Sequence, residues 1–559
     1  MFSFDNDSAI AERQMQAVIF SLTAFGYIDG DFASSEKDFI KLHIQKLVEQ
    51  RARDAGLTDL ALCREEVARW TAHYHEVLDG FDQSIQAYFQ ESVAEGESTQ
   101  QFVLAKLKLH AFEHFRGFPP EIRAGLLGMV DALMHADGVV HASEQKFRDE
   151  FEALIGLPIE LQDFDMELVA EGSVVIDAAC ELPLREANHP FLQSFEWNYA
   201  PDKATFLQQS ALDIDLIQRF QAQLEAERAK GAGKLADSQD FSAFAGQEPF
   251  LDGHVYVVPP VAGKQYELLV LGDLHGCYSC LKAALLQADF FEKVQAYHRD
   301  PDNNPFMMVV FLGDYIDRGK FSYNGILRTV MQLYLAAPGH VLVLRGNHEY
   351  YVEYNGRVLA PVRPSEAMSS LEAIAPVELF ASWMKMFEAL PNMLVFGKTL
   401  FVHAGIPRDD TLEAKYKGLA SLNDSELRFQ MLWSDPSSEA VIPRELQKAT
   451  ARFSFGTRQF KEFMARLGCT TMIRGHERIV SGFKMLVEEP EAVLLSLFSC
   501  GGKNNGDLPE KSNYRQVTPM ALTIRYEDGA NMLTPFAIDY EKFNDPSSNA
   551  FFAVGTAKG

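Results

Sequence analysis

The sequence predicts an all-α region followed by a larger α/β region, and three observations lead to this division. From residue 8 to about residue 165, apolar side chains recur every three or four positions, as at Ile40, Ile44 and Leu47, which is the spacing of amphipathic helices. From residue 254 onward, short apolar runs end in polar clusters, a pattern typical of buried strands with chemistry at their carboxyl ends. Residues 231–249, rich in Ala, Ser, Gly and Gln, separate the two patterns and predict a flexible linker.

The length of the chain also indicates more than one domain, since 559 residues exceed what a single hydrophobic core usually spans. Between the two regions, residues 203–229 have the pattern of one amphipathic helix. We therefore expect an acidic helical domain over residues 1–165, a connector with this helix and the linker over 166–253, an α/β domain over 254–545 and a tail over 546–559.

The composition is that of an ordinary globular protein, with 47% hydrophobic and 23% charged residues. No apolar run approaches the roughly 20 residues of a membrane-spanning helix, and the first residues do not have the pattern of a signal peptide. Six cysteines in so long a chain indicate a reducing compartment rather than a disulfide scaffold. We expect a cytoplasmic protein with no membrane partner.

The negative charge is concentrated in the first half of the chain. The formal net charge is −27, and residues 1–250 hold 20 Lys and Arg against 43 Asp and Glu, whereas the remaining 309 residues hold 31 against 35. Contact with nucleic-acid phosphates needs Lys and Arg, so we expect no nucleic-acid partner. We interpret the acidic half as a solvated surface, with recruitment of basic partners or cations as the alternative.

The helical region contains an internal echo. Residues 28–39 and 136–147 share the pattern Asp-Gly, four residues, Ser-Glu, two residues, Phe, which is typical of one helix ending and the next beginning at a Ser N-cap. The pattern resembles tellurite-resistance TerB-like helical domains, which carry similar Asp-Gly loops. A cation site at Asp29, Asp31 and Glu36 is the alternative to helix capping; we favour capping because the spacing does not fit a twelve-residue EF-hand loop.

Polar clusters follow most of the expected strands of the α/β region. The strands are expected at 266–271, 306–312, 340–344, 399–402, 470–473 and 493–498, and the clusters lie at 272–276, 313–319, 346–349, 403–405 and 474–477. Together the clusters supply three imidazoles, two carboxylates, an amide and a further acid–base pair. Mixed nitrogen and oxygen donors of this kind suit two divalent cations.

These clusters, with residues 432–436 and the pair Phe455-Gly456, resemble the PPP-type phosphoprotein phosphatase family over residues 254–545. The resemblance implies a metallophosphoesterase β-sandwich flanked by helices. It also implies hydrolysis of phosphoserine and phosphothreonine in protein substrates. Two cations about 3.5–4 Å apart would clamp both oxygens of an in-line displacement, and a hydroxide that bridges them would be the nucleophile.

The resemblance also implies the ligands of both metals. Asp273, His275 and Asp314 would hold the first metal, and Asp314 would bridge to the second, because a carboxylate can bridge two cations and a neutral imidazole cannot. The ligands that complete the second metal would be Asn347, His403 and His476. This donor set admits Mn, Fe or Zn.

The resemblance also implies which residues act on the substrate. His348 would be the general acid that protonates the departing alkoxide, with Asp317 orienting its ring. Arg318 would grip phosphate oxygens through its planar fork, and Asn347 would also contact the phosphate.

The sequence departs from the family pattern at two places. The family's second phosphate-binding Arg stands seven residues before the Gly of Phe-Gly, where this chain has Ala449; Arg452 or Arg444 could substitute, and we favour Arg452. The family's Ser-Ala-Pro-Asn-Tyr segment is replaced by residues 499–505, so the tyrosine that overhangs the site is expected to be missing. Lys503 would supply a cation in its place.

Two alternatives to a protein phosphatase remain. One is a diadenosine tetraphosphate hydrolase or another nucleotide phosphoesterase of the same superfamily, which residues 272–278 also resemble. The other is a binding module without activity, which should have lost a ligand or the acid, and neither loss is seen. For the acidic N-terminal half, we expect intramolecular regulation or targeting of the phosphatase, with the 203–229 helix covering its cleft.

Overall fold

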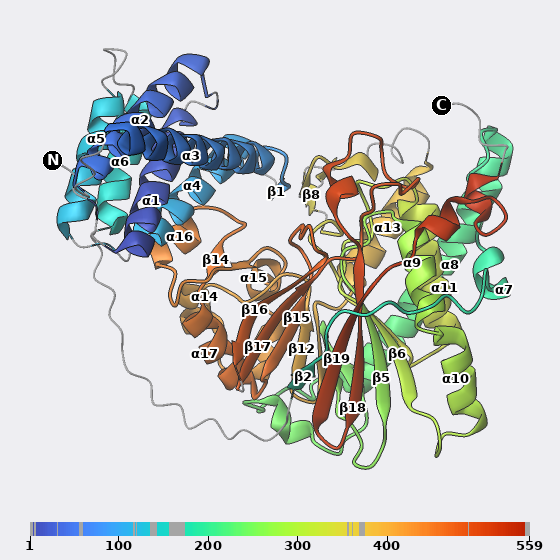
Figure 1. Ribbon diagram of the computed structural model, residues 1–559. Coiled ribbons are helices and arrows are strands. Elements are labelled where there is room, and N and C mark those ends of the chain that lie inside the picture. Colours follow the sequence, from blue (N-terminus) through green and yellow to red (C-terminus); the bar gives the residue numbers. More distant parts are fainter. Residues whose placement is uncertain are drawn as a thin grey trace. The chain divides into compact units, whose positions relative to one another are not determined.

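The computed structural model divides into two compact units, residues 1–165 and 166–559, which are described separately (Figure 1). It describes residues 4, 7–28, 30, 32–54, 60–94, 96–115, 118, 120–134, 142–155, 174–350, 352–354, 357–359, 362–367, 375–489 and 491–553. Among these residues, no helix is both long and apolar enough to cross a bilayer.

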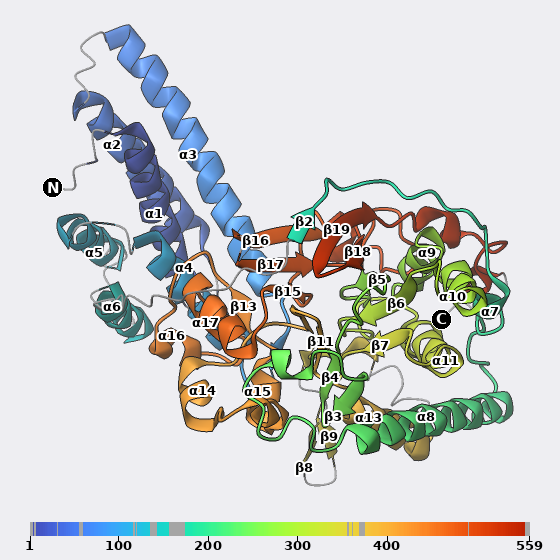
Figure 2. The same cartoon turned by 90° about the horizontal axis from the view of Figure 1, so that it is seen from below.

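The first unit is helical, as the spacing of apolar residues predicted. Its elements are α1 (Ser8–Gly26), α2 (Ser34–Asp54), α3 (Leu60–Tyr88), the short strand β1 (Val93–Ala94), α4 (Thr99–Phe115), α5 (Pro120–Met134) and α6 (Ala142–Ile155). Ile40, Ile44 and Leu47 are buried in its core. Helices α2 and α3 run alongside each other, and α1 packs against both (Figure 2).

The start of α2 is capped by a side chain of its own first turn. A carboxylate oxygen of Glu36, in the first turn, accepts a hydrogen bond from the backbone nitrogen of Ala33 at 2.8 Å. This reach back toward the helix start is half of a capping box. Asp29 and Asp31, the other members of the alternative cation site, lie outside the described residues, as does Asp137 in the second copy of the echo.

The second unit contains two large sheets (Figure 1). The six-stranded sheet has the order β2 (Val174–Ile176), β19 (Ala530–Ala537), β18 (Met520–Glu527), β5 (Tyr266–Leu271), β6 (Phe306–Phe311) and β7 (Val341–Val343). The seven-stranded sheet has the order β16 (Phe483–Glu489), β17 (Ala492–Leu497), β15 (Thr471–Arg474), β12 (Thr399–Val402), β11 (Met393–Phe396), β4 (Val255–Val258) and β3 (Phe250–Asp252). The six predicted strands coincide with strands of these sheets to within one residue at either end.

Alternation along the strands explains how the two sheets meet. In β11, Leu394 and Phe396 join the main core together with β5 and β6, whereas Met393 and Val395 face a second core on the other side of their sheet. Successive side chains of a strand point to opposite faces. One face of the seven-stranded sheet therefore packs on the six-stranded sheet, and its other face packs on helices such as α17 (Thr457–Leu467). The predicted sandwich flanked by helices is confirmed.

Shorter elements complete this unit. The helices are α7 (Pro190–Gln193), α8 (Lys203–Gly231), α9 (Tyr278–Gln287), α10 (Phe290–Arg299), α11 (Arg328–Ala336), α13 (Val377–Ala389), α14 (Asp409–Lys415), α15 (Ser425–Gln430) and α16 (Arg444–Lys448). The short strands are β8 (Val352–Tyr354), β9 (Arg357–Leu359), β10 (Val362–Arg363), β13 (Asp435–Pro436) and β14 (Ser454–Phe455). Helices α10 and α11 pack against β6 and β7, the edge of the six-stranded sheet (Figure 1).

The segment 231–249 differs from the predicted flexible linker. Leu235, Phe241 and Phe244 are buried in the second core, and the backbone nitrogen of Leu235 donates to a carboxylate oxygen of Asp252 at 2.8 Å. Small and polar residues make up most of this segment, so its overall composition did not reveal that these three apolar side chains are buried. The segment is therefore packed onto the sandwich.

Helix α8 is likewise part of the scaffold and not a cover for the cleft. It packs on α11, α13 and β3, and places Ile217, Phe220 and Leu224 in the main core (Figure 2). Its Asp213 carboxylate also pairs with the buried Arg328 guanidinium through two contacts of 3.0 Å. The end of the chain differs from the predicted tail in the same way, since Phe551 is buried in the main core.

Candidate metal centre

The polar clusters meet where strands of both sheets end. Asp273 and His275 follow β5, Asp314 follows β6, and Asn347 follows β7, all in the six-stranded sheet. His403 follows β12 and His476 follows β15, which lie in the seven-stranded sheet. The structure thus brings together the six residues that the resemblance implied as metal ligands, and all six are buried.

Asp314 lies at the middle of this group. One of its carboxylate oxygens is 3.5 Å from His275 Nε2, and the other is 3.4 Å from His403 Nε2. Asp273 lies on the first side, with an oxygen 3.7 Å from His275 Nε2. His476 lies on the second side, with Nδ1 3.2 Å from His403 Nε2. The two oxygens of Asp314 therefore face two separate sets of donors.

The ring nitrogens at the centre are lone-pair donors. His275 Nδ1 donates to the carbonyl oxygen of Ile316 at 2.8 Å, and His403 Nδ1 donates to that of Leu312 at 3.0 Å. In a neutral imidazole the other nitrogen then carries no proton. Burial lowers the pKa of His275, His403 and His476 well below the usual range, which favours this neutral form.

Asn347 provides the most direct indication of a cation. Its amide oxygen lies 2.9 Å from His403 Nε2 and 3.2 Å from His476 Nδ1, and both Asp314 carboxylate oxygens are 3.2 Å away. The two Asp314 oxygens are acceptors, and so is His403 Nε2 when Nδ1 of that ring donates to Leu312. An amide nitrogen could occupy this position without a metal, whereas a divalent cation would satisfy the oxygen and its neighbours together.

One further atom at the centre lacks a partner. A carboxylate oxygen of Asp273 is buried without a hydrogen bond. Burial raises the pKa of Asp273 to about 7 and raises the pKa of Asp314 well above the usual range, with the charges of neighbouring carboxylates adding to the shift. Buried carboxylates are stabilised by a positive charge. The donor set therefore fits two divalent cations that share Asp314.

The backbone around the centre is strained. His275, Asp314, Asp317, Arg318 and His476 have positive φ values between 41° and 73°. Among the residues that the structure describes, only three other non-glycine residues have positive φ. Such conformations cost energy and persist where the surrounding structure holds them, which is frequent at functional sites.

Two glycines allow the loops to approach the carboxylates. A Cβ atom on Gly346 would lie 2.1 Å from an Asp314 carboxylate oxygen, and a Cβ on Gly475 would lie 2.3 Å from one of Asp273. Both distances are shorter than any van der Waals contact. These glycines are therefore required by the close approach of their backbone to the proposed ligands.

His348 and Asp317 lie beside the centre. His348 Nδ1 is 2.6 Å from a carboxylate oxygen of Asp317, and His348 Nε2 is 3.8 Å from Asp314. The other carboxylate oxygen of Asp317 accepts a hydrogen bond from the backbone nitrogen of Ala367 at 2.8 Å. Burial raises the pKa of Asp317 to about 6, against the opposing charge of Arg318. Asp317 thus fixes the orientation of the His348 ring.

Glu349 was not assigned a role from the sequence. Its carboxylate accepts hydrogen bonds from the backbone nitrogens of Asp314, Tyr315 and Gly346 at 2.8–3.0 Å. It therefore joins the loops after β6 and β7, which carry Asp314 and Asn347. The only feature of the sequence that pointed to a role for Glu349 was its position directly after His348.

The structure distinguishes the two candidate arginines. Arg452 is 7% exposed, and its Nε donates to a carboxylate oxygen of Asp435 at 2.7 Å. The other oxygen of Asp435 is 3.8 Å from His476 Nε2. Burial is the main cause of the lowered pKa of His476, and the positive charge of Arg452 lowers it further. Arg444 instead pairs with Glu413 at the surface.

Arg318 lies at the other side of the centre, next to a tyrosine that the sequence analysis missed. Its Nη1 donates to both carboxylate oxygens of Glu366, at 2.7 and 2.8 Å. The ring of Tyr514 lies beside Arg318, 5.4 Å from the ring of His275. The expectation of a missing tyrosine was therefore wrong, because a turn at Asn513–Gln516 returns the chain to the centre. Lys503 is exposed.

Comparisons with known proteins find similarity over the part of the chain that carries these residues. The family described as calcineurin-like phosphoesterase matches residues 266–478. The chain is similar to the probable serine/threonine-protein phosphatase ECU05_0440 of Encephalitozoon cuniculi (strain GB-M1), with 28% identity over 227 residues, 39% of this chain and 44% of that protein. It is also similar to serine/threonine-protein phosphatase 5 of Homo sapiens, with 27% identity over 232 residues, 39% of this chain and 40% of that protein.

The chain spans less than half the length of these curated relatives. Among solved structures, it matches a protein serine/threonine phosphatase from Saccharomyces cerevisiae with similarity to human phosphatase PP5, at 15% identity and a TM-score of 0.36, over 59% of this chain and 90% of that one. The family match and the architecture together indicate a calcineurin-like metallophosphoesterase domain in a mixed α/β fold, preceded by a helical region.

Proposed function

We propose that this chain is a phosphomonoesterase that depends on two metals and hydrolyses phosphoserine and phosphothreonine in proteins. The observation that carries the proposal is the convergence of neutral imidazole nitrogens and carboxylate oxygens on the two sides of Asp314. The similarity to proteins named serine/threonine phosphatases supports the choice of substrate.

Asp273, His275 and Asp314 would hold one cation, and Asp314, Asn347, His403 and His476 would hold the other. When bound, two divalent cations supply Lewis acidity that ionises water near neutral pH and neutralises phosphoryl oxygens. The nitrogen and oxygen donors suit Mn, Fe or Zn. Because the site is buried and enclosed by strained loops, its residues are positioned before substrate binds.

His348 would act as the general acid. Its Nδ1 is held by the Asp317 carboxylate, which leaves Nε2 turned toward the centre. A bound phosphate dianion favours the protonated ring, and Asp317 stabilises the positive charge. The Nε2 proton can then pass to the leaving serine or threonine oxygen as its bond to phosphorus breaks.

Arg318, Asn347 and Arg452 would bind the phosphate. Burial lowers the pKa of His348, and the charges of both arginines lower it further, so both act on the ring of the proposed acid. Two guanidinium groups can orient one phosphate through planar, charge-assisted hydrogen bonds.

The proposal is tested by hydrolysis of a phosphothreonine peptide, with metal-stripped protein before and after addition of Mn²⁺. We expect activity to return with Mn²⁺, and His348→Asn to reduce kcat by about 10²–10⁴-fold, the usual contribution of a general acid. His298→Asn, at an exposed position of α10, is the matched control and should retain activity.

Metal-independent activity, or an unchanged rate for His348→Asn, would contradict this mechanism. A preference for diadenosine tetraphosphate over phosphopeptides would instead retain the centre and change the substrate. Measuring both substrates with the same metal-loaded protein separates these outcomes.

For the N-terminal unit we propose a TerB-like helical domain that regulates or targets the phosphatase. Its acidic charge, opposite to that of a metal-loaded centre, supports a regulatory role. The test compares kinetics on a phosphopeptide and on a folded phosphoprotein, with and without residues 1–173. Equal kinetic constants for both substrates would rule out regulation.

A further inference from the structure

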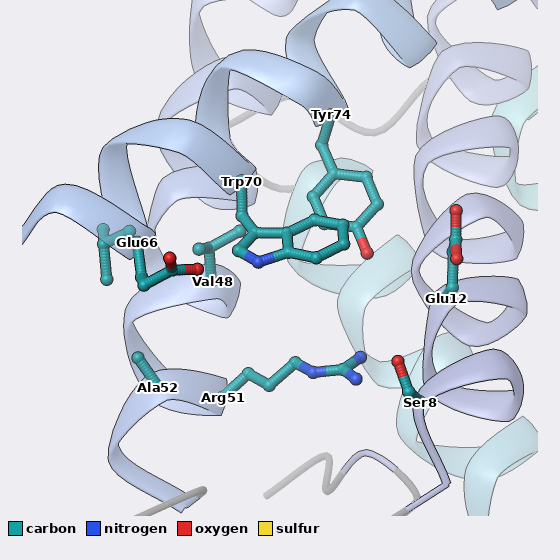
Figure 3. A pocket seen from close by; sticks show the side chains of 9 residues that line it. Ser8, Glu12, Val48, Arg51, Ala52, Glu66, Trp70 and Tyr74 are labelled. Atoms are coloured by element: carbon teal, nitrogen blue, oxygen red, sulfur yellow. The ribbon is translucent and has the colours of Figure 1, made fainter. Parts of the chain in front are cut away.

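A pocket in the helical unit lies within the described N-terminal helices and is unrelated to the metal centre. Its walls come from α1, α2 and α3, and its volume is about 220 Å³ (Figure 3). Sites for drug-sized ligands usually measure about 300–1,000 Å³, so this pocket suits a smaller molecule.

Arg51 of α2 is the charged group that faces into this pocket. Figure 3 shows its guanidinium extended across the space between α2 and Ser8 of α1. Its Nη1 is buried without a hydrogen-bond partner, and among the described residues no ion pair to Arg51 is found. Its guanidinium carbon lies 5.8 Å from the centroid of the Phe4 ring. Burying part of a guanidinium without an anion is unfavourable, so the pocket favours an anionic ligand.

The two acidic residues of the pocket form no ion pair with Arg51 among the described residues. A carboxylate oxygen of Glu66 accepts a hydrogen bond from Arg69 at 2.6 Å, and one of Glu12 lies 3.8 Å from Nε2 of His73, a ring that pairs with it only when protonated. The Arg51 guanidinium is therefore a cation of the pocket without a carboxylate partner. Glu12 and Glu66 nevertheless repel a multiply charged anion, so a single negative charge fits better than a phosphate dianion.

The rest of the pocket is apolar and contains a flat surface. The Trp70 indole lies above the Arg51 guanidinium and next to the Tyr74 ring, with 5.8 Å between the ring centroids and 27° between the planes (Figure 3). Val48, Ala52 and Val67 complete the apolar wall. A planar ligand can stack in this space, as aromatic rings prefer.

We propose that this pocket binds a small aromatic monocarboxylate. The carboxylate pairs with the Arg51 guanidinium beside the Ser8 hydroxyl, and the ring lies against Trp70. This inference goes beyond the proposed phosphatase function and uses none of its residues. Because few atoms make contact, the affinity is roughly micromolar to millimolar.

The test is titration of phenylacetate into the full-length protein, followed by saturation-transfer NMR and by tryptophan fluorescence. We expect saturable binding of phenylacetate. Phenylacetamide, which has the same shape without the charge, should bind about tenfold more weakly, as should phenethylamine, because a charged partner strengthens a hydrogen bond to guanidinium. Inorganic phosphate should not compete.

Variants of residues that line the pocket test whether phenylacetate binds there. Arg51→Gln should weaken phenylacetate binding about tenfold, whereas Arg53→Gln, at an exposed position of the same helix, should leave it unchanged. Ala52→Leu keeps Arg51 but fills the pocket with a larger side chain, so it should abolish phenylacetate binding. Thermal unfolding of each variant checks the fold.

Four results would overturn the proposal. They are no saturable binding of phenylacetate, unchanged binding by a folded Arg51→Gln or Ala52→Leu variant, equal or tighter binding of the amide or the amine, and displacement by inorganic phosphate. Since none of these measurements involves phosphate hydrolysis, their outcome is independent of whether the chain is a phosphatase.

Discussion

At the scale of single residues, the arginine proposed to grip phosphate is already engaged by a carboxylate. Arg318 donates to both oxygens of Glu366 and to the carbonyl oxygen of Pro364, and its side chain is 9% exposed, whereas that of Glu366 is 52% exposed. A substrate phosphate must therefore compete with Glu366 for the same guanidinium. Solvent around Glu366 keeps this competition weak.

Glu366→Gln is expected to lower KM for a phosphothreonine peptide by up to about fivefold, since an exposed ion pair contributes roughly 0–1 kcal/mol. The kcat value should change little, because the variant does not alter Asp317 or His348. Steady-state kinetics measure both constants. Glu413→Gln, which removes the surface partner of Arg444, is the control. An unchanged or higher KM for Glu366→Gln would mean that the pair does not oppose substrate binding.

Arg452→Ala and Arg444→Ala form a second matched pair. Arg452 lies in the buried network with Asp435 and Arg474, and Arg444 lies at the surface. Loss of a charge-assisted hydrogen bond to phosphate should reduce kcat/KM about 10–100-fold for Arg452→Ala. Arg444→Ala should have no effect. The reverse order of effects would transfer the second phosphate contact to Arg444.

At the scale of elements, strands were predictable from the sequence because they are buried on both faces. β5, β6 and β12 are apolar apart from Glu267 and Thr399, and a polar ligand follows within three residues of the end of each strand. Contacts between distant segments were not predictable. Tyr514 reaches His275 through a turn far along the chain, and Phe241 anchors a segment whose composition resembles a linker.

Gly475→Ala tests how closely the loop after β15 must approach the centre. The added Cβ would lie 2.3 Å from the Asp273 carboxylate and would displace this ligand. We expect an about 10–100-fold loss of Mn²⁺ affinity, similar to the loss of a residue that positions a metal ligand. Equilibrium dialysis with metal analysis measures it. Gly80→Ala, where nothing lies within 4 Å of the new Cβ, should retain full affinity.

At the scale of the whole molecule, the sandwich includes residues well before its first large strands. Leu216, Ile217, Phe220 and Leu224 of α8 are buried in the main core. Each such side chain contributes about 1.5–3 kcal/mol, and the four together rival the roughly 5–15 kcal/mol that stabilises a typical protein. Helix α8 therefore belongs to the folding unit of the metal centre.

Two truncated chains test this boundary. A chain that begins at residue 174 keeps β2 and α8, and should unfold cooperatively and hydrolyse the phosphopeptide. A chain that begins at residue 250 loses α8 and the segment with Phe241, and should fail to fold. Circular dichroism during heating measures both. A folded, active chain from residue 250 would show that α8 is dispensable.

The most direct test of the two-metal centre is the number of Mn²⁺ ions bound per chain, measured by plasma mass spectrometry after loading and removal of excess metal. We expect two ions in the natural sequence and loss of both, with loss of phosphopeptide hydrolysis, in Asp314→Asn, because its carboxylate faces both donor sets. Asp213→Asn, at a buried ion pair of the scaffold, should keep two ions if it folds. One ion or none in the natural sequence, or two ions in Asp314→Asn, would contradict a centre bridged by Asp314.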